Sequence, residues 1–326
     1  MRKIATLENT DDLPTRFLSE HHTPSGLSAW PGVRDTPRCC VLRISRYGRS
    51  LRHSRRERHW PRAAFSTVAS ADGTKIAFER RGSGPALILI GGGLNDRAMA
   101  APLADLLAGD FSVYTYDRRG RGDSTDTAPY AVKREVEDLA ALIGAIGVPV
   151  SIFGHSSGAI LALEAAAAKL PIVKLAVYEP PFNIDAKADA QSSALAADVA
   201  ALLKDEKYEE TVTFFLTGIG MPAPMIAEVK KSPMWSTFVS LAPTLNYDLA
   251  IVHNGGTSHV PTERIKTISV PVVAVAGGDS PDGMKQAAQA VASAAQHGQY
   301  QEMAGQTHYA PPEVIAPLLK AFFSKD

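Results

Sequence analysis

The sequence predicts an α/β fold with a mostly parallel central sheet and helices on both of its faces. From residue 65 onward, short β-type runs alternate with amphipathic helical runs, the order that builds a sheet from strand–helix–strand units. The run Ala86–Ile90 is apolar on both faces, as in a strand buried between two helical layers. The alternation stops at Pro180-Pro181 and resumes at Val270, which indicates an inserted segment.

The expected elements follow one another without internal repeats. The Asp-Gly turn between residues 65–69 and 75–79 favours a hairpin. Further strands are expected at 86–90, 112–116, 148–153, 173–178, 270–276 and 299–303. Core helices are expected at 96–108, 130–146, 159–168, 283–295 and 313–324. Residues 182–262 contain helical runs and no clear strand, so we interpret them as a helical cap inserted into the domain.

Charge divides the chain of 326 residues into two parts, although its net charge is zero. Residues 1–62 hold twelve arginines and one lysine against six acidic residues, and they show no sustained hydrophobic period. We interpret residues 1–62 as a disordered basic N-terminal extension and residues 63–326 as one globular domain. The domain is mildly acidic, so nucleic acid is not expected as its partner.

Several function classes are not expected from the composition. No run approaches the roughly 18 apolar residues of a membrane span, and the first thirty residues lack the apolar core of a secretory signal. Both cysteines, Cys39 and Cys40, lie in the extension, which argues against a disulfide framework, a thiol nucleophile or a cysteine zinc site in the domain. We expect a cytoplasmic protein without a membrane partner or a cofactor, and its oligomeric state stays open.

The most informative motif is Gly154-His155-Ser156-Ser157-Gly158, which lies between an apolar run and a helix-forming run. A serine at a sharp strand-to-helix turn presents its hydroxyl outward, and only small flanking residues permit that turn. The helix behind it offers free N–H groups and the positive end of its dipole. We therefore expect Ser156 to be a nucleophile.

A serine hydroxyl needs a general base, most often a histidine. Of the nine histidines, most lie in the N-terminal extension, in the cap or at the expected end of a surface helix. His155 is adjacent to the nucleophile and is expected to point elsewhere. His308 lies in the loop after the last short strand. Because the carboxyl ends of parallel strands carry the ligand-binding loops, we expect His308 to be the base.

Three carboxylates compete for the task of orienting His308. Asp279 lies at the carboxyl end of the strand expected at 270–276 and is the first choice. Glu179 ends the strand that follows the nucleophile helix and is an alternative. Asp282 is a further alternative, but it is expected to begin a helix, where a carboxylate complements the dipole.

An oxyanion hole is expected at the glycine-rich turn Gly91-Gly92-Gly93-Leu94, directly after a buried strand. Glycines allow the backbone to turn its N–H groups inward, so Gly93 or Leu94 would supply one donor. Ser157 would supply the other. Phosphate binding is the rival interpretation of a glycine-rich loop, but neither G-x-G-x-x-G nor the Lys-Ser/Thr of a P-loop is present.

The loop Asp117–Ser124 contains three arginines, which would suit a phosphate. We prefer to interpret it as a tight turn whose charges pair among themselves.

These motifs resemble those of the α/β-hydrolase superfamily over about 260 residues, from Phe65 to the end of the chain. The order serine, acid, histidine, the glycine turn and the serine turn all fall at family-like positions. Two departures are the absence of the His-Gly that is common at the oxyanion turn, and Ser280 in the position where relatives often carry the catalytic acid. The resemblance implies hydrolysis of an ester, a lactone or a related bond without a cofactor.

We expect a serine hydrolase that cleaves a carboxylic ester or lactone of a small, apolar substrate. The alternatives are a cofactor-free haloperoxidase-like enzyme or a C–C bond hydrolase with the same triad, or a ligand receptor without catalysis on the same fold. An apolar pocket is expected from seven cap residues: Phe214, Phe215, Met221, Met225, Met234, Trp235 and Phe238.

Overall fold

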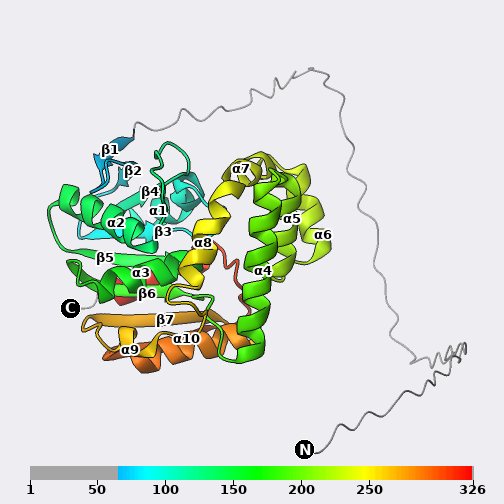
Figure 1. Cartoon of the computed structure of the whole chain (residues 1–326). Coiled ribbons are helices and arrows are strands. Elements are labelled where there is room, and N and C mark those ends of the chain that lie inside the picture. Colours follow the sequence, from blue (N-terminus) through cyan, green and yellow to red (C-terminus); the bar gives the residue numbers. More distant parts are fainter. Residues whose placement is uncertain (1–64, 325–326) are drawn as a thin grey trace, which may run out of the picture. The chain divides into compact units, whose positions relative to one another are not determined.

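The computed structural model describes residues 65–324, and the predicted N-terminal extension lies outside the described residues. In the described part, eight strands form one sheet in the order β1-β2-β4-β3-β5-β6-β7-β8 (Figure 1). The strands are β1 (Ser66–Ala69), β2 (Lys75–Arg81), β3 (Ala86–Ile90), β4 (Ser112–Tyr116), β5 (Val150–His155), β6 (Ile172–Tyr178), β7 (Pro271–Gly277) and β8 (His297–Met303). Only the pairs β1–β2 and β2–β4 are antiparallel. The predicted fold class is therefore confirmed.

The sheet register brings the predicted site residues to one edge. Ile90 at the end of β3 is opposite Gly154 in β5, and His155 at the end of β5 is opposite Tyr178 in β6. Tyr178 is in turn opposite Val275 in β7. Because these strands are parallel, the segments that follow β3, β5 and β6 emerge side by side.

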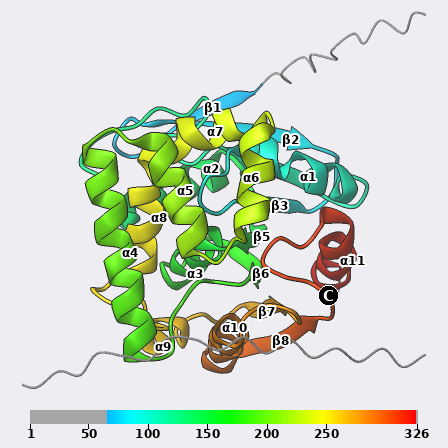
Figure 2. The same ribbon diagram turned by 90° about the vertical axis from the view of Figure 1, so that its right-hand side faces the viewer.

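Helices cover both faces of the sheet, since successive side chains of a strand point to opposite sides. In β3, Ile88 and Ile90 pack in one hydrophobic cluster, and Leu87 and Leu89 pack in another. The first cluster is covered by α2 (Val132–Ile146), α3 (Ser157–Ala167) and α10 (Asp282–Ala294). The second is covered by α1 (Ala101–Leu107) and α11 (Pro312–Phe323), which Figure 2 shows together on one side of the sheet.

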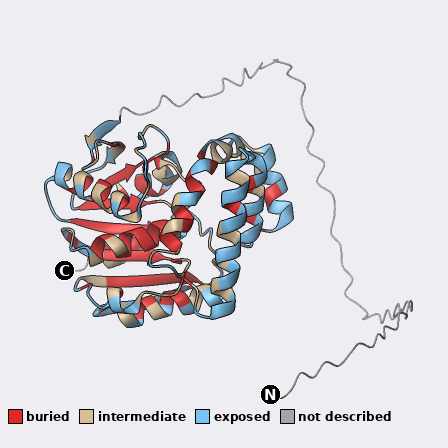
Figure 3. Cartoon of the chain, viewed as in Figure 1, coloured by how far each residue is buried: buried red, intermediate tan, exposed pale blue. Residues whose placement is uncertain are grey.

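The segment between β6 and β7 is helical, and the predicted cap, residues 182–262, lies within it. Its helices are α4 (Ala186–Lys204), α5 (Tyr208–Gly218), α6 (Ala223–Lys231), α7 (Met234–Leu241), α8 (Leu245–Val252) and the short α9 (Thr262–Ile265). Figure 3 shows that the outer faces of α4 to α6 are largely exposed, whereas α3 and central strands such as β3, β4 and β5 are buried. Asn183 and His259 form an isolated parallel bridge where the chain leaves and rejoins the core.

The remaining differences from the expected elements are local. The helix expected at 96–108 is divided into a 3-10 turn, η1 (Arg97–Ala100), and α1, and Pro102 occupies the first turn of α1. His297, expected at a helix end, begins β8 instead. Among the described residues, no helix combines the length and the apolar character needed to cross a membrane.

Candidate active site

Ser156 occupies a strained turn between β5 and α3. Its backbone has φ 56° and ψ −128°, a region that residues with a side chain rarely adopt. Both motif glycines are required: a Cβ on Gly154 would lie 2.5 Å from Gly158 O, and one on Gly158 would lie 2.5 Å from Ile90 O. The Ser156 N–H donates to Tyr178 O at 3.0 Å, which ties the turn to β6. The local sequence therefore fixes where the serine hydroxyl lies.

The His308 ring is held by Glu179. Oε2 of Glu179 lies 2.7 Å from His308 Nδ1, and Oε1 accepts the N–H of Gly277 at 2.7 Å. Burial raises the pKa of a carboxyl group, but contacts with His308, Ser280 and the Gly277 amide outweigh it and lower the pKa of Glu179. The Ser280 contact falls short of full hydrogen-bond geometry. Because an ionised carboxylate only accepts, Nδ1–H donates to it, which leaves Nε2 as the ring nitrogen that would accept a proton from Ser156.

The structure corrects the choice of acid. Asp279, the first choice from the sequence, is exposed, and the carboxylate bonded to His308 is that of Glu179. Asp282 begins α10, and its side chain is 85% exposed. The reason lies in the strand order, because Glu179 directly follows β6, the neighbour of the strand that carries Ser156. Asp279 lies beyond the end of β7, one strand further away.

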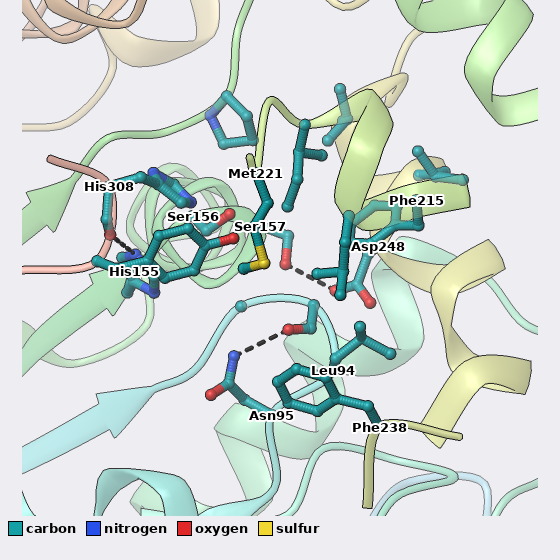
Figure 4. Close-up of a pocket in the computed structure, with 18 of the residues that line it drawn as sticks. Leu94, Asn95, His155, Ser156, Ser157, Phe215, Met221, Phe238, Asp248 and His308 are labelled. Atoms are coloured by element: carbon teal, nitrogen blue, oxygen red, sulfur yellow. Dashed lines mark hydrogen bonds between the residues drawn. The ribbon is translucent and has the colours of Figure 1, made fainter. Parts of the chain in front are cut away.

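His155, which was expected to point elsewhere, lies against His308. The two ring centroids are 4.7 Å apart, and His155 Nε2 lies 2.9 Å from the His308 backbone oxygen (Figure 4). Burial and the neighbouring His308 lower the pKa of His155 to about 3, so its ring is neutral and Nε2–H donates to that oxygen. The Tyr178 hydroxyl donates to Thr307 O at 2.6 Å. Side chains from β5 and β6 thus hold the loop that carries the predicted base.

The glycine turn after β3 passes directly beside the nucleophile. A Cβ on Gly92 would lie 2.7 Å from Ser156 Cβ and 3.3 Å from Ser156 Oγ, so no other residue fits there without displacement. Leu94 continues the turn at φ 57°. Its side chain is buried in the hydrophobic cluster of the cap, which anchors the turn from the cap side.

Among the described residues, the backbone N–H groups of Gly93, Leu94 and Ser157 have no hydrogen-bond acceptor. These are the predicted oxyanion donors. Asn95 Nδ2 donates to Gly93 O at 2.9 Å (Figure 4). Because N–H and C=O of a trans peptide point in opposite directions, this bond turns the Leu94 N–H away from Asn95.

The arginines of the loop Asp117–Ser124 do not pair within the loop, contrary to the expectation. Arg118, Arg119 and Arg121 are all buried and bind carboxylates from other elements. The pairs are Arg118 with Glu135 and Asp248, Arg119 with Asp72 and Asp138, and Arg121 with Asp248. These arginines connect the loop to the core and to the cap, and nothing here favours a phosphate site.

A cavity of about 300 Å³ opens above Ser156, and His308, Gly93 and Asp248 also line it. The structure records no hydrogen bond between the Ser156 hydroxyl and the His308 ring. Four of the seven predicted cap residues contribute to an apolar wall: Phe215, Met221, Met234 and Phe238. The other three do not line it: Phe214 and Met225 are exposed, and Trp235 packs within the cap beside Lys230.

No metal site is evident at this pocket. Among residues 65–324, no group of three or more His, Cys, Asp or Glu side chains is arranged to hold a metal ion. The acidic side chain that lines the cavity, Asp248, is bonded to two arginines and to Ser157.

The fold and this arrangement of residues define an α/β hydrolase. The sequence model of the Alpha/beta hydrolase family matches residues 87–317, and the chain belongs to that family. The match spans the serine turn, Glu179 and His308, as well as the whole cap.

Individual proteins support the same classification. A crystal structure of an alpha/beta hydrolase from Sphaerobacter thermophilus is 44% identical, with a TM-score of 0.72 over 79% of this chain and 100% of that chain. A thermophilic esterase from Thermogutta terrifontis shares the fold at 18% identity, with a TM-score of 0.63 over 80% of this chain and 98% of that chain. An uncharacterized hydrolase of Bacillus subtilis, YraK, is 36% identical over 96 residues, which are 28% of this chain and 35% of YraK.

Proposed function

We propose that this protein is a serine hydrolase that cleaves a carboxylic ester or lactone with a small apolar acyl group. The observation that carries the proposal is that His308, which lines the same pocket as the strained Ser156, is bonded to the buried Glu179. A buried carboxylate bonded to Nδ1 fixes the tautomer that a general base needs. The fold shared with an esterase is consistent with this chemistry but does not define the substrate.

In the acylation step, Ser156 Oγ attacks the carbonyl carbon while His308 Nε2 accepts the hydroxyl proton. The hydrogen bond between a catalytic hydroxyl and its base, here Ser156 and His308, often forms only in the substrate complex. The carbonyl oxygen becomes negatively charged and accepts from the N–H of Ser157 and that of Gly93 or Leu94. The intermediate collapses, His308 returns the proton to the leaving oxygen, and an acyl ester on Ser156 remains.

Deacylation repeats the sequence with water as the nucleophile. His308 takes a proton from the water, the hydroxide attacks the acyl carbon, and the proton then returns to Ser156 Oγ. Glu179 stays ionised throughout and stabilises the imidazolium that forms in each step. For a lactone, the alcohol and the acid released are parts of one molecule.

The pocket wall favours an uncharged acyl group. The cap supplies aliphatic, thioether and phenyl surface, including Phe215, Met221 and Phe238. Both carboxylate oxygens of Asp248 are already bonded to protein groups. A cavity of about 300 Å³ suits a short acyl chain rather than a long one.

The test is hydrolysis of p-nitrophenyl esters from acetate to octanoate, with γ- and δ-lactones measured in parallel. We expect activity on the shorter esters and a loss of at least about 10³-fold in Ser156→Ala, because only binding and oxyanion effects then remain. The matched control is Ser192→Ala, which changes a serine on the cap wall of the same pocket. A Ser156→Ala variant that keeps more than about a tenth of the wild-type rate contradicts the proposal.

The same assay separates the alternatives. A receptor without catalysis shows no ester turnover in the wild type. A haloperoxidase-like or C–C bond hydrolase is indicated if ester turnover is weak and peroxide-dependent oxidation or cleavage of a β-diketone is faster. Each of these reactions also requires Ser156, so the alanine variant identifies the site in every case.

A further inference from the structure

A buried polar cluster joins the cap to the core beneath the pocket. Its members are Asp248 on α8, Arg118 and Arg121 in the loop after β4, Glu135 on α2, and Ser157 at the start of α3. Asp248 Oδ1 accepts from Arg118 Nη1 at 2.7 Å and from Ser157 Oγ at 2.6 Å, while Oδ2 accepts from Arg121 Nη2 at 2.7 Å. Arg118 also forms a two-pronged pair with Glu135 at 2.6 and 2.7 Å. We call these five residues the Asp248 cluster.

The charges of the Asp248 cluster balance, since two guanidinium groups face two carboxylates. Burial opposes ionisation of Asp248, but Arg121 and Arg118 outweigh it and hold the pKa of Asp248 below its ordinary value. An ion pair this deeply buried adds little net stability over an apolar core, yet removal of one partner is costly. A role in positioning accounts for the cluster better than stability alone does.

One arm of the cluster reaches the glycine turn. Arg121 Nη1 donates to Gly92 O at 2.7 Å and to Asn95 O at 3.1 Å. The Gly92 carbonyl and the Gly93 N–H belong to the same planar trans peptide and point in opposite directions. Arg121 therefore fixes the direction of the Gly92 carbonyl and, opposite to it, the direction of the Gly93 N–H, in a peptide that lies next to Ser156.

Asp248 also contacts the second segment of the predicted oxyanion hole, the start of α3. Its bond to the Ser157 hydroxyl restrains the residue whose backbone N–H is the second predicted donor (Figure 4). One cap carboxylate thus contacts, directly or through Arg121, both segments that form the predicted oxyanion hole.

We propose that Asp248 is a positioning residue, which through Arg121 fixes the Gly92–Gly93 peptide and thereby couples the oxyanion hole to the cap. This inference rests on the proposed serine hydrolase function. It assigns Gly93, rather than Leu94, as the donor that the cap controls.

The experiment compares Asp248→Asn with Asp138→Asn. Asp138 is the matched control, because it is buried and pairs with Arg119 of the same loop at 2.7 and 2.8 Å, but it does not contact the glycine turn. The first measurement is the amide resonance of Gly93 in protein labelled with ¹⁵N-glycine. We expect it to shift in Asp248→Asn and to stay in place in Asp138→Asn.

The second measurement is kinetic, with p-nitrophenyl butyrate as substrate and butylboronic acid as a tetrahedral analogue. We expect kcat of Asp248→Asn to fall about 10²-fold, with KM changed less than about threefold, because a misplaced donor is felt mainly in the transition state. Inhibition by butylboronic acid should weaken by a similar factor. In Asp138→Asn both quantities stay near the wild-type values, even if thermal stability falls.

Arg121→Lys is the second variant, to be used if Asp248→Asn fails to fold. It keeps the positive charge, but a single ammonium group cannot bond to Asp248 and Gly92 O with the geometry of the guanidinium group. We expect the same shift of the Gly93 resonance and the same loss of kcat. An unmoved Gly93 resonance, or equal kinetic losses in the Asp248 and Asp138 variants, overturns the inference. If the wild type neither hydrolyses esters nor binds the boronic acid, the proposed function fails, and the Gly93 resonance still decides whether Asp248 holds the turn.

Discussion

Replacement of Glu179 by glutamine is the most direct test of how His308 is oriented. The two side chains have the same shape, so the effect comes from hydrogen bonding. In the structure Oε1 accepts from the Gly277 N–H and Oε2 accepts from His308 Nδ1–H. A glutamine has one oxygen and one NH₂ group. Because the Gly277 amide requires an acceptor, the NH₂ group is left to face Nδ1.

The consequence is the wrong tautomer of His308. An NH₂ group donates, so Nδ1 must accept and the ring proton moves to Nε2, where it blocks removal of the proton from Ser156. The variant also loses the negative charge that stabilises the imidazolium. A change of this kind lowers turnover by roughly 10⁴-fold, or about 5 kcal/mol in the barrier. We expect KM to change little, because Glu179 is fully buried and does not line the pocket.

The assay is steady-state hydrolysis of p-nitrophenyl butyrate by Glu179→Gln and by Asp279→Asn. Asp279 is the matched control, since it is a carboxylate beyond the end of the neighbouring strand β7 but is exposed to solvent. We expect Asp279→Asn to keep kcat within about twofold of the wild type. If Asp279→Asn were crippled and Glu179→Gln mild, the assignment of the acid from this structure would be refuted.

Two further predictions concern packing and pH. Gly92→Ala should destabilise the fold by about 1–3 kcal/mol and abolish turnover, because the new Cβ would lie 2.7 Å from Ser156 Cβ. The control is Gly144→Ala, whose Cβ would have nothing within 4 Å and which should be neutral or stabilising in thermal unfolding. Wild type and Glu179→Gln should converge in melting temperature as pH falls. The folded-state pKa of Glu179 is lowered, so its contribution is complete above the unfolded value of about 4.3 and is lost as pH falls through the folded pKa. Melting curves that stay parallel from pH 7 to pH 3 would exclude this linkage.

The fold could be predicted from the sequence because it depends on local patterns. Alternating apolar runs and helical periods fix the strands, and Ala86–Ile90 already shows a strand buried on both faces. The serine turn is equally local, since strand, glycines and helix are contiguous. The position of His308 could be predicted because the order of elements places its loop at the carboxyl-terminal edge of the parallel strands, whereas its role as the base stays a prediction.

The acid could not be chosen from the sequence, because three carboxylates fall near strand ends and spacing alone does not order the strands. The sheet places β6, and with it Glu179, between the strand of Ser156 and β7. Ser280 indicated that the acid lies elsewhere, because it occupies the position where relatives often carry the catalytic carboxylate. It did not distinguish Glu179 from Asp279, which is the neighbour of Ser280 in the chain.

The Asp248 cluster was missed for a related reason. Asp248 is separated from Arg121 by 127 residues, and in sequence it is one acidic residue on a cap helix among several. The three arginines after β4 suggested a self-contained loop. Only the folded chain shows that their partners come from α2, α8 and the first hairpin.

Backbone strain is concentrated where three adjacent strands end. Among the described residues other than glycine, Leu94, Ser156 and Glu179 have φ values of 57°, 56° and 47°, and they follow β3, β5 and β6. Such conformations cost about 1–3 kcal/mol each and persist only where the surroundings impose them. The remaining cases, Lys169 and Glu206, lie just past the ends of α3 and α4, where a left-handed residue commonly closes a helix.

The two groups of strained residues therefore have different causes. At the helix ends, the left-handed residue satisfies carbonyl groups of the last turn. At the strand ends, Ser156 and Leu94 line the pocket and Glu179 binds His308, which also lines it, and the buried sheet beneath supplies the stability that offsets the cost. Left-handed residues that follow three adjacent strands at one edge of the sheet are difficult to explain by packing alone. They are expected if that edge must hold a nucleophile and an oxyanion donor within reach of one carbonyl group, and an acid within reach of the base.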